Sequence, residues 1–579
     1  MNFFKLINKN PVWFLFLFFF LVLFIKCVAF IYIAAFDSSG WDDWAEPLLI
    51  YQILMYIGVC GMISSFVFIL RWRWLIVIGS VFLDVWLMGN LIYWRSYHDM
   101  LSVYSLEAAG NMSGYWSSIF VFLEWKDALF LLLTILLAAV IIYLPKTRCK
   151  LWTNIIYFLV CFFLSTLCVY PHAKSMKRIT GFSHPLNSKY ATDNWFPNIY
   201  YCEQYTPITY FLLHLRVLVS ISNEIKPLIN IEDIEPFLSK NDDMDHRENY
   251  NLLIVLFESM ETWVVHSEIN NQPIMPNLNK LLSSQHCLFA DKVTDQTLYG
   301  KSMDGQQILN TGLLPVYRGV TTNRYWSNFY FSITNALQNY TKNSYIEHDG
   351  TCWNEFQTAM SYGYDTVAIN MESDLFISKD VIKNMPKKPY VIQVVTGGSH
   401  SPFTNFNDSS LFVTPTDMPK DMANYIKSVN YTDHALGLLF DNISLDSTIV
   451  IVTGDHTIFY DDKREMFQQY CNKNNIDIPV EKAFVPLIIH SPDIKERALV
   501  ADTVYQMDIY PTLLPLLHRE DYIWQGFGIN LLDKGAKRKI TPDEALRLSD
   551  AIIRNDFFRT ISDYIAPDNK TITIFESNQ

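Results

Sequence analysis

Four residues that can bind metals or take part in proton transfer follow apolar runs in the C-terminal half of the sequence. LLIVLF ends at Glu258, IQVVTGGS ends at His400, and STIVIVTG ends at Asp455 and His456. A single acid or histidine at a strand end is usually a helix cap or a hydrogen-bond partner. Two carboxylates and an imidazole together suit a divalent ion such as Mn²⁺ or Zn²⁺. An open position on that ion would activate an oxygen nucleophile, so the sequence predicts a metal site.

The elements that carry these residues are short apolar runs that alternate with helical segments from Asn251 onward. The runs are NLLIVLFES, DTVAINM, KPYVIQVVTGGSH, DSTIVIVTGDH and FVPLIIHSP. Continuous Val, Ile and Leu runs bounded by turn residues are typical of strands buried on both faces. Their alternation with helices indicates an α/β domain with a central, mostly parallel sheet. Ligands collect beyond the carboxyl ends of such strands, which is where the four residues lie.

The first 171 residues hold nearly all the long apolar runs. Five runs are long enough to cross a hydrocarbon core, which takes about 20 residues, and they lie at residues 12–36, 47–70, 74–94, 127–144 and 153–171. Lys26 and Asp84 interrupt two of these spans near mid-depth. We expect them to face the bundle interior and to pair. The alternative is that Lys26 snorkels to the interface and Asp84 lines a hydrated crevice.

Basic residues near the span ends indicate the orientation, because Lys and Arg are retained on the cytoplasmic side. Most of them lie before the first span, between the second and third spans, and between the fourth and fifth spans, which all face one side of the membrane. They are Lys5, Lys9, Arg71, Arg73, Lys146, Arg148 and Lys150. We therefore expect a cytoplasmic N-terminus and an extracytoplasmic chain after about residue 172.

These patterns divide the chain into a five-helix transmembrane domain (1–171), a juxtamembrane connector (172–250), a catalytic domain (251–533) and a helical tail (534–579). Within the connector, residues 207–221 predict an interfacial amphipathic helix, since His214 and Arg216 interrupt the apolar run. In the tail, Ile540-Thr541-Pro542 predicts the start of a helix.

The composition excludes several classes of protein. Of the 579 residues, 50% are hydrophobic and 18% are charged, and the formal net charge is -13. So apolar a chain is neither disordered nor fibrous. The acidic balance and the lack of a basic stripe exclude nucleic acid as a partner.

The motifs resemble those of the lipoteichoic acid synthase-like branch of the alkaline phosphatase and sulfatase superfamily. The matching segments occur in the family's order: LLIVLFESM (252–260), IMPNLNKL (274–281), YGKSMDG (299–305), VTGGSHSPF (395–403), TGDH (453–456) and MDIYPTLLPLL (507–517). The resemblance implies a five-span anchor in a bacterial cytoplasmic membrane and an extracytoplasmic domain with the superfamily fold. It also implies one divalent ion, with Mn²⁺ as first choice and Zn²⁺ or Mg²⁺ as alternatives.

By this resemblance the metal ligands are Glu258, Ser302, Asp455 and His456. Ser302, which follows Gly-Lys, would also be the nucleophile. Other interpretations are that Ser302 only caps a helix, or that Thr297 or Thr294 is the nucleophile. The Gly-Lys-Ser sequence lacks the first glycine of a nucleotide-binding P-loop, where Asp295 stands, so an NTPase is excluded. A true sulfatase needs the motif Cys/Ser-x-Pro-x-Arg at the nucleophile. This chain has SMDGQ at that position, which argues against a true sulfatase.

Lys301 and His400 would offset charge on the non-bridging oxygens of the substrate phosphate. The resemblance implies substrate contacts by His400, His348, Asp349, Trp353 and Asn354. The last four belong to EHDGTCWNEF (347–356), which is similar to the family's head-group loop but departs from it twice. Glu355 stands where an Arg that binds phosphate is expected, and the spacing from His to Trp is shorter. A Glu would repel a phosphodiester and attract an ammonium head group.

Three functions remain open on these grounds. The first is a metal-dependent phosphotransferase that moves glycerophosphate from phosphatidylglycerol to a glycan or lipid-linked acceptor and leaves diacylglycerol in the membrane. The second is the same mechanism with phosphatidylethanolamine as donor, which Glu355 favours. The third is a membrane sensor or scaffold without catalysis, against which the complete set of site residues argues.

Overall fold

The structure is a computed structural model that describes residues 10–39, 49–97, 100–102, 122–145, 151–180, 184–187, 198–221, 226–240, 250–347, 350, 352–369, 372–404, 412–459 and 461–565. The chain forms two compact units. Met1–Leu106 and Gly114–Glu224 make the first, and Glu107–Ser113 and Ile225–Gln579 make the second.

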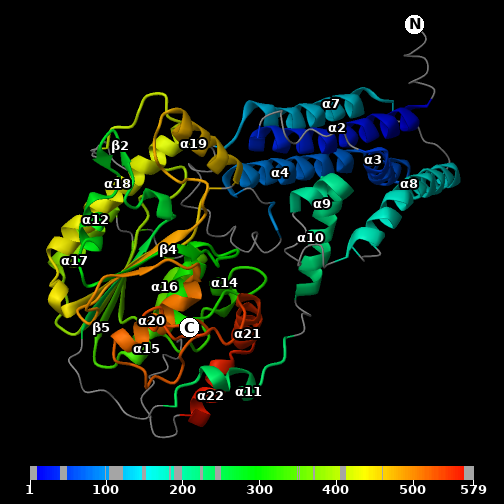
Figure 1. The fold of residues 1–579 in the computed structure, drawn as a ribbon. Helices are drawn as coiled ribbons and strands as arrows, with labels where there is room; N and C mark the ends of the chain where they lie inside the picture. The colour runs from blue at the N-terminus through cyan, green and yellow to red at the C-terminus, as the bar shows by residue number, and fades with distance from the viewer. Residues whose placement is uncertain are drawn as a thin grey trace. The chain divides into compact units, whose positions relative to one another are not determined.

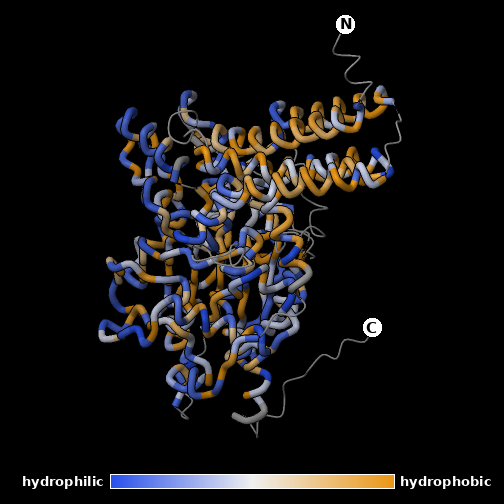
Figure 2. Tube along the Cα trace, turned by 90° about the vertical axis from the view of Figure 1, so that its right-hand side faces the viewer, coloured by the Kyte–Doolittle hydropathy of each residue, from blue (hydrophilic) through white to orange (hydrophobic). Residues whose placement is uncertain are grey.

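The first unit is helical and strongly apolar. Its long helices are α2 (Pro11–Ser39), α3 (Ile50–Ser65), α4 (Trp74–Tyr97), α7 (Ala128–Tyr143) and α8 (Leu151–Thr180). With their short flanking turns, five segments here are long and apolar enough to cross a membrane, and Figure 2 shows the hydrophobic colour running along these helices. The predicted five-span bundle is therefore confirmed.

A buried polar cluster joins α2, α4 and α7. Lys26 Nζ forms an ion pair with Asp84 and donates hydrogen bonds to Ser80 Oγ (2.7 Å) and Thr134 Oγ1 (2.6 Å). Thr134 Oγ1 in turn donates to Asp84 Oδ2 (2.5 Å). Both charged side chains are fully buried. The predicted pairing is confirmed and snorkelling of Lys26 is wrong, because three polar partners satisfy its ammonium group inside the bundle.

A second polar cluster ties together the ends of the same three helices. Arg95 donates to both carboxylate oxygens of Asp127 (2.7 and 2.8 Å) and to Asp37 Oδ2 (2.6 Å). Lys126 Nζ donates to Asp37 Oδ1 (2.5 Å). Bidentate Arg–carboxylate contacts fix geometry as well as charge. These contacts and the Lys26–Asp84 pair thus hold α2, α4 and α7 together at two levels.

The helix α8 packs closely on α3 through small residues, which allow close approach between helices in membranes. A Cβ on Gly58 would lie 2.6 Å from Val169 Cγ2, and one on Gly61 would lie 2.4 Å from Ser165 Oγ. The helix α8 continues past the predicted span end to Thr180. It is followed by α9 (Asn198–Tyr205) and α10 (Pro207–Ile221), and α10 covers the predicted interfacial helix.

The second unit contains a sheet of nine strands in the order β10-β4-β9-β8-β1-β7-β5-β6, with β11 also paired to β4. The strands are β1 (Asn251–Phe257), β4 (Cys287–Thr294), β5 (Thr341–Ile346), β6 (Thr366–Ala368), β7 (Tyr390–Val395), β8 (Thr448–Gly454), β9 (Val485–His490), β10 (Ala498–Val500) and β11 (Val504–Tyr505). All pairs are parallel except those of β9 with β4 and β8. The predicted α/β fold with a mostly parallel sheet is confirmed.

Both faces of the sheet are covered, which explains the continuous apolar runs. Along β1, Leu252, Ile254 and Leu256 enter one core, and Leu253, Val255 and Phe257 enter the other. The first core receives side chains from α13 (Ser302–Thr311), α16 (Glu355–Tyr362), α20 (Ile509–Leu516) and α21 (Pro542–Asn555). The second receives them from α12 (Pro276–Leu282), α17 (Asp374–Lys383), α18 (Lys420–Asp441) and α19 (Asp461–Lys473). Figure 1 shows α12, α17 and α18 on one face of the sheet and α15 (Ile333–Ala336), α16 and α20 on the other.

The helix α21 begins where the sequence predicted a start. Thr541 is its N-cap and forms a reciprocal capping pair with Glu544. Ala545 and Ile552 of this helix are buried in the same core as β1, as is Ile234 of α11 (Ile231–Ile234). These three residues lie before and after the expected 251–533 domain. They pack into one unit with the sheet because their side chains complete its core.

Candidate active site

The carboxyl ends of β1 and β8 bring three of the predicted ligands together. The two strands are neighbours, with Phe257 beside Gly454, so the residues that follow them meet at one edge of the sheet. Glu258, Asp455 and His456 each offer one ligand atom, and these atoms all lie within 4.8 Å of one another. All three side chains are buried.

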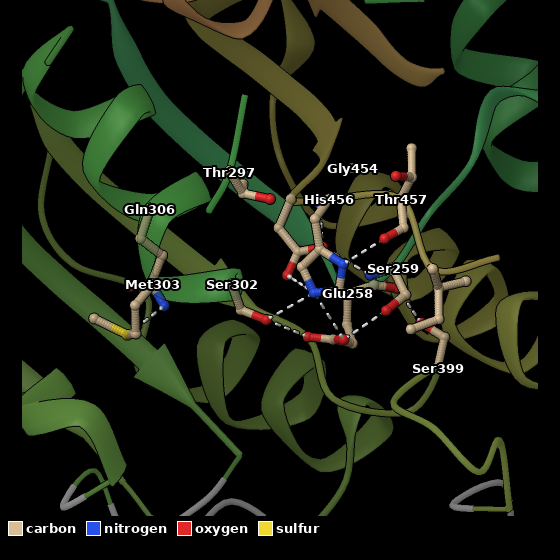
Figure 3. A network of polar contacts seen from close by, with 12 residues as sticks. Glu258, Ser259, Thr297, Ser302, Met303, Gln306, Ser399, Gly454, His456 and Thr457 are labelled. Carbon is tan, nitrogen blue, oxygen red and sulfur yellow. Dashed lines mark hydrogen bonds and ion pairs between the residues drawn. The ribbon is translucent and has the colours of Figure 1, made fainter. Parts of the chain in front are cut away.

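Ser302 is the first residue of α13 and joins this group (Figure 3). Its hydroxyl donates to Glu258 Oε2 (2.9 Å) and lies 3.3 Å from His456 Nε2. The N-cap of the helix is Lys301, not Ser302. The hydroxyl of Ser302 therefore faces the cluster of ligands instead of capping the helix, while Thr297, an alternative nucleophile, donates its hydroxyl to Asp295 Oδ1 (2.7 Å).

The hydrogen bonds of the cluster leave lone pairs directed at its centre. His456 Nδ1 donates to the carbonyl of Thr457 (3.0 Å), so the lone pair of the neutral ring lies on Nε2, the atom nearest Ser302. Asp455 Oδ1 accepts from the amides of Ser259 and His456, at 2.7 Å each. Asp455 Oδ2 is buried and has no hydrogen-bond partner among the described residues. A buried carboxylate oxygen without a partner is costly unless a cation satisfies it.

The electrostatics of the cluster also fit a divalent ion. Burial raises the pKa of Glu258, and the neighbouring charge of Asp455 raises it further. Burial raises the pKa of Asp455 to about 6. Burial lowers the pKa of His456, which keeps its ring neutral. Two carboxylates crowded into a dry site disfavour ionisation unless a cation is close, so the residues present fit a metal ion that binds two carboxylates, one imidazole and one hydroxyl.

A buried acid that sequence analysis did not single out shapes the turn before Ser302. Asp304 Oδ2 accepts from the amides of Leu298 (2.8 Å) and Gly300 (2.9 Å). A Cβ on Gly300 would lie 2.2 Å from Asp304 Oδ1, and Lys301 has a φ of +45°. The only sequence signal for Asp304 is an acid in the first turn of the helix. This turn presents Ser302 to Glu258 and His456, and the charge of Lys301 is close enough to lower the pKa of His456.

The loop that carries His400 is anchored to the same cluster. Ser399 Oγ donates to the carbonyl of Glu258 (2.5 Å). Asp374 accepts hydrogen bonds from the amides of Gly397 (2.9 Å) and Gly398 (3.0 Å), which precede Ser399 in the chain. His400 Nδ1 donates to the carbonyl of Ser401 (2.7 Å), and its charge lowers the pKa of Glu258. His400 and Lys301 are thus both within electrostatic reach of the ligands.

The head-group segment is described in part. His348 and Asp349 lie outside the described residues. Trp353 and Asn354 both have left-handed backbone, with φ of 57° and 54°, in a short turn from Cys352 to Asn354. Asn354 Nδ2 donates to the carbonyl of Thr322 (3.3 Å). Two consecutive positive-φ residues that are not glycine are strained, and such strain collects at functional sites.

Glu355, the residue that departs from the family pattern, packs against α13, the helix that begins at Ser302. It is the first residue of α16, is only 2% exposed, and accepts a hydrogen bond from Gln306 Nε2 (2.6 Å). Gln306 lies one turn after Ser302 on α13, so the two side chains share a face of that helix. Gln306 Oε1 also accepts from Gln393 Nε2 (3.4 Å) on β7. The Glu355 carboxylate is therefore engaged with the protein interior.

With this geometry established, comparison with known proteins gives the family. Residues 1–196 match the model described as lipoteichoic acid synthase N-terminal domain, and residues 250–518 match the sulfatase model. The chain is 22% identical to lipoteichoic acid synthase 2 of Bacillus subtilis strain 168, over 78% of this chain and 74% of that protein. The chain belongs to the lipoteichoic acid synthase-like family of the alkaline phosphatase and sulfatase superfamily.

Two further relatives extend the similarity over both units. The lipoteichoic acid synthase-like protein YvgJ of the same Bacillus strain is 22% identical, over 92% of this chain and 88% of that protein. The solved structure of the integral membrane lipooligosaccharide phosphoethanolamine transferase A from Neisseria meningitidis has a TM-score of 0.57 at 11% identity, over 87% of this chain and 95% of that chain. It supports the shared fold. This lipoteichoic acid synthase-like protein is a membrane-anchored phosphotransferase of its superfamily.

Proposed function

We propose that this protein moves a glycerophosphate group from phosphatidylglycerol to an extracytoplasmic glycan or lipid-linked acceptor, through a covalent intermediate on Ser302. The observation that carries the proposal is the position of the Ser302 hydroxyl, 2.9 Å from Glu258 Oε2 and 3.3 Å from His456 Nε2. The names of the relatives, which are lipoteichoic acid synthases, favour a glycerophosphate donor.

The residues of the site can perform the transfer in two displacements. In the first, Ser302 Oγ attacks the donor phosphorus, and the bond from phosphorus to the diacylglycerol oxygen breaks. The Ser302 hydroxyl proton passes to Glu258 Oε2 and from there to solvent, and solvent supplies one proton to the diacylglycerol oxygen as it leaves. In the second, an acceptor hydroxyl attacks phosphorus and loses its proton to solvent, the bond to Ser302 Oγ breaks, and Ser302 Oγ takes up one proton in return. His400 and Lys301 offset charge on the non-bridging phosphate oxygens.

The site would hold one divalent ion, with Mn²⁺ as first choice and Zn²⁺ or Mg²⁺ as alternatives. Its ligands would be Glu258, Ser302, Asp455 and His456. When bound, the ion would lower the pKa of the Ser302 hydroxyl and stabilise the negative charge that develops during transfer. The buried Asp455 Oδ2 without a partner supports this assignment.

The membrane arrangement that suits this reaction has a cytoplasmic N-terminus and an extracytoplasmic catalytic unit on a bacterial cytoplasmic membrane. The basic residues near the span ends support it. Phospholipid head groups of the outer leaflet would then be the donor pool.

Transfer of phosphoethanolamine from phosphatidylethanolamine is the second candidate, and Glu355 is the observation behind it. That acid stands where a phosphate-binding Arg is expected. Its side chain is 2% exposed and hydrogen-bonded to Gln306, which turns its charge toward the interior and favours phosphatidylglycerol. The third candidate, a scaffold without catalysis, is disfavoured because a complete set of ligands would serve no purpose there.

The test uses the purified full-length protein in liposomes with Mn²⁺ and either phosphatidylglycerol or phosphatidylethanolamine as sole donor. We expect diacylglycerol release from phosphatidylglycerol that is lost in Ser302→Ala. Ser283→Ala is the matched control, since Ser283 is an exposed residue at the end of α12. Release from phosphatidylethanolamine alone would establish the second candidate. No release and no bound metal would favour the scaffold.

A further inference from the structure

One half-buried carboxylate joins the segment that leads to Ser302 with the segment that follows His456. Asp295 Oδ1 accepts hydrogen bonds from the amide (2.8 Å) and the hydroxyl (2.7 Å) of Thr297. Its Oδ2 accepts from the amide and the hydroxyl of Thr457, at 2.9 Å each. Figure 3 shows Thr297 and Thr457 beside His456. Each oxygen of the Asp295 carboxylate thus accepts two hydrogen bonds from one of the two segments.

A second set of hydrogen bonds runs alongside the first. The amide of Gln296 donates to Gln506 Oε1 (2.7 Å), and Gln296 Oε1 accepts from the amide of Met507 (2.9 Å). Gln506 Nε2 donates to the carbonyl of Asp455 (2.7 Å). Residues 295 and 296 together therefore attach the nucleophile segment to the stretch that carries Asp455 and His456.

The link matters because Ser302 and His456 come from different elements. Ser302 begins α13, whereas His456 follows β8. The imidazole donates its Nδ1 proton to the carbonyl of Thr457 (3.0 Å), so the backbone of Thr457 sets the direction of Nε2 toward Ser302. Asp295 holds that backbone through the amide of Thr457. Hydrogen bonds to a carboxylate are shorter and stronger than neutral ones, which makes Asp295 a firm anchor.

We propose that Asp295 is a positioning residue of the transfer reaction, which fixes His456 relative to Ser302 by tying Thr457 to Thr297. The proposal rests on the proposed function, because it assumes that Ser302 and His456 work together at one ion. Outer partners of metal ligands orient those ligands, and their loss lowers metal affinity or activity by about 10- to 100-fold. Asp295 acts on the ligand His456 through one residue, Thr457.

The experiment compares the wild-type protein with Asp295→Asn and Asp295→Glu. Asparagine keeps the size but replaces one acceptor oxygen with an amino group that faces two donors, whereas glutamate keeps the carboxylate. We expect the Kd for Mn²⁺, measured by calorimetry, to rise about tenfold or more in Asp295→Asn and to recover partly in Asp295→Glu. We also expect kcat for diacylglycerol release to fall about 10- to 100-fold with little change in KM. Asp502→Asn, at an exposed acid of the same unit, should leave both quantities unchanged.

Three outcomes separate the possibilities. An unchanged Kd and kcat in Asp295→Asn would overturn the proposal and leave the proposed function intact. A wild-type protein that binds Mn²⁺ but releases no diacylglycerol would count against the proposed function, and the Kd of the variants would still decide the role of Asp295. If Asp295→Asn does not fold, Thr457→Ala removes only one of the four hydrogen bonds and should raise the Kd about threefold; no rise would overturn the proposal.

Discussion

Replacing either member of the Lys26–Asp84 pair should destabilise the membrane unit far more than replacing both. The two side chains are fully buried and bonded to each other. Lys26→Met would leave a buried carboxylate without its counter-ion, and Asp84→Leu would leave a buried ammonium group, each at a cost of about 3–5 kcal/mol. The double variant removes both charges and keeps the 2.7 Å contact between Ser80 and Thr134. Its free energy of unfolding should lie within about 1 kcal/mol of the wild type, since apolar residues often replace buried ion pairs at little cost.

The coupling energy follows from these figures. Two additive losses would total about 6–10 kcal/mol, so a double variant near the wild type implies a coupling of about 5 kcal/mol or more. Unfolding of the full-length protein in detergent, followed by helical circular dichroism, gives the four stabilities. Phe82→Leu on α4 is the matched control, because Phe82 is 71% exposed on the outside of the bundle. A double variant whose loss equals the sum of the single losses would refute the pairing argument.

The remaining predictions concern the catalytic unit. Burial raises the pKa of Asp455 to about 6, so this carboxyl is mostly ionised at pH 7 and mostly protonated at pH 5. Since Mn²⁺ binds the ionised form, the Kd should rise about tenfold from pH 7 to pH 5 by calorimetry; a flat profile would contradict this. Thr541→Ala removes the N-cap paired with Glu544 and should lower the unfolding free energy by about 1 kcal/mol in urea titrations. Gly454→Ala should prevent metal binding, since its Cβ would lie 2.1 Å from the carbonyl of Met260; normal binding would show that the strand end can shift.

The sequence predicts the centre of the site well because parallel strands end at a common edge. β1 and β8 are continuous apolar runs that can be recognised from their own sequence. The residues that follow them lie at the carboxyl ends of parallel strands, so their position near one another does not depend on the packing of the other elements. β4 and β5 are harder to recognise. Asp291 and Lys292 interrupt the apolar pattern of β4, and β5 (TKNSYI) begins with four polar residues, of which Thr341 is exposed. Their strand character depends on neighbours supplied by the fold.

The residues that hold the site in place have no local signal. Asp295 bonds to Thr457, 162 positions away. Glu261 and Arg464, 203 positions apart, form a fully buried ion pair. Glu261 Oε1 also accepts hydrogen bonds from the amides of Ile458 and Phe459, which follow His456 in the chain. Neither spacing follows a helical or strand period, so a single sequence does not predict these contacts.

The same limit applies to Glu355. From the sequence its charge favours an ammonium head group, whereas the structure places it against Gln306 with 2% exposure. Burial and partner choice depend on how α13 and α16 pack, which residue types alone do not specify.

A covalent intermediate on Ser302 can be detected by rapid-quench mass spectrometry. The full-length protein is mixed with phosphatidylglycerol liposomes and Mn²⁺, quenched in acid before turnover is complete, and digested. We expect the peptide containing Ser302 to gain the mass of a glycerophosphoryl group, and the gain to be absent in Ser302→Ala. Diacylglycerol release without any adduct on Ser302, or with an adduct on Thr297 instead, would contradict it.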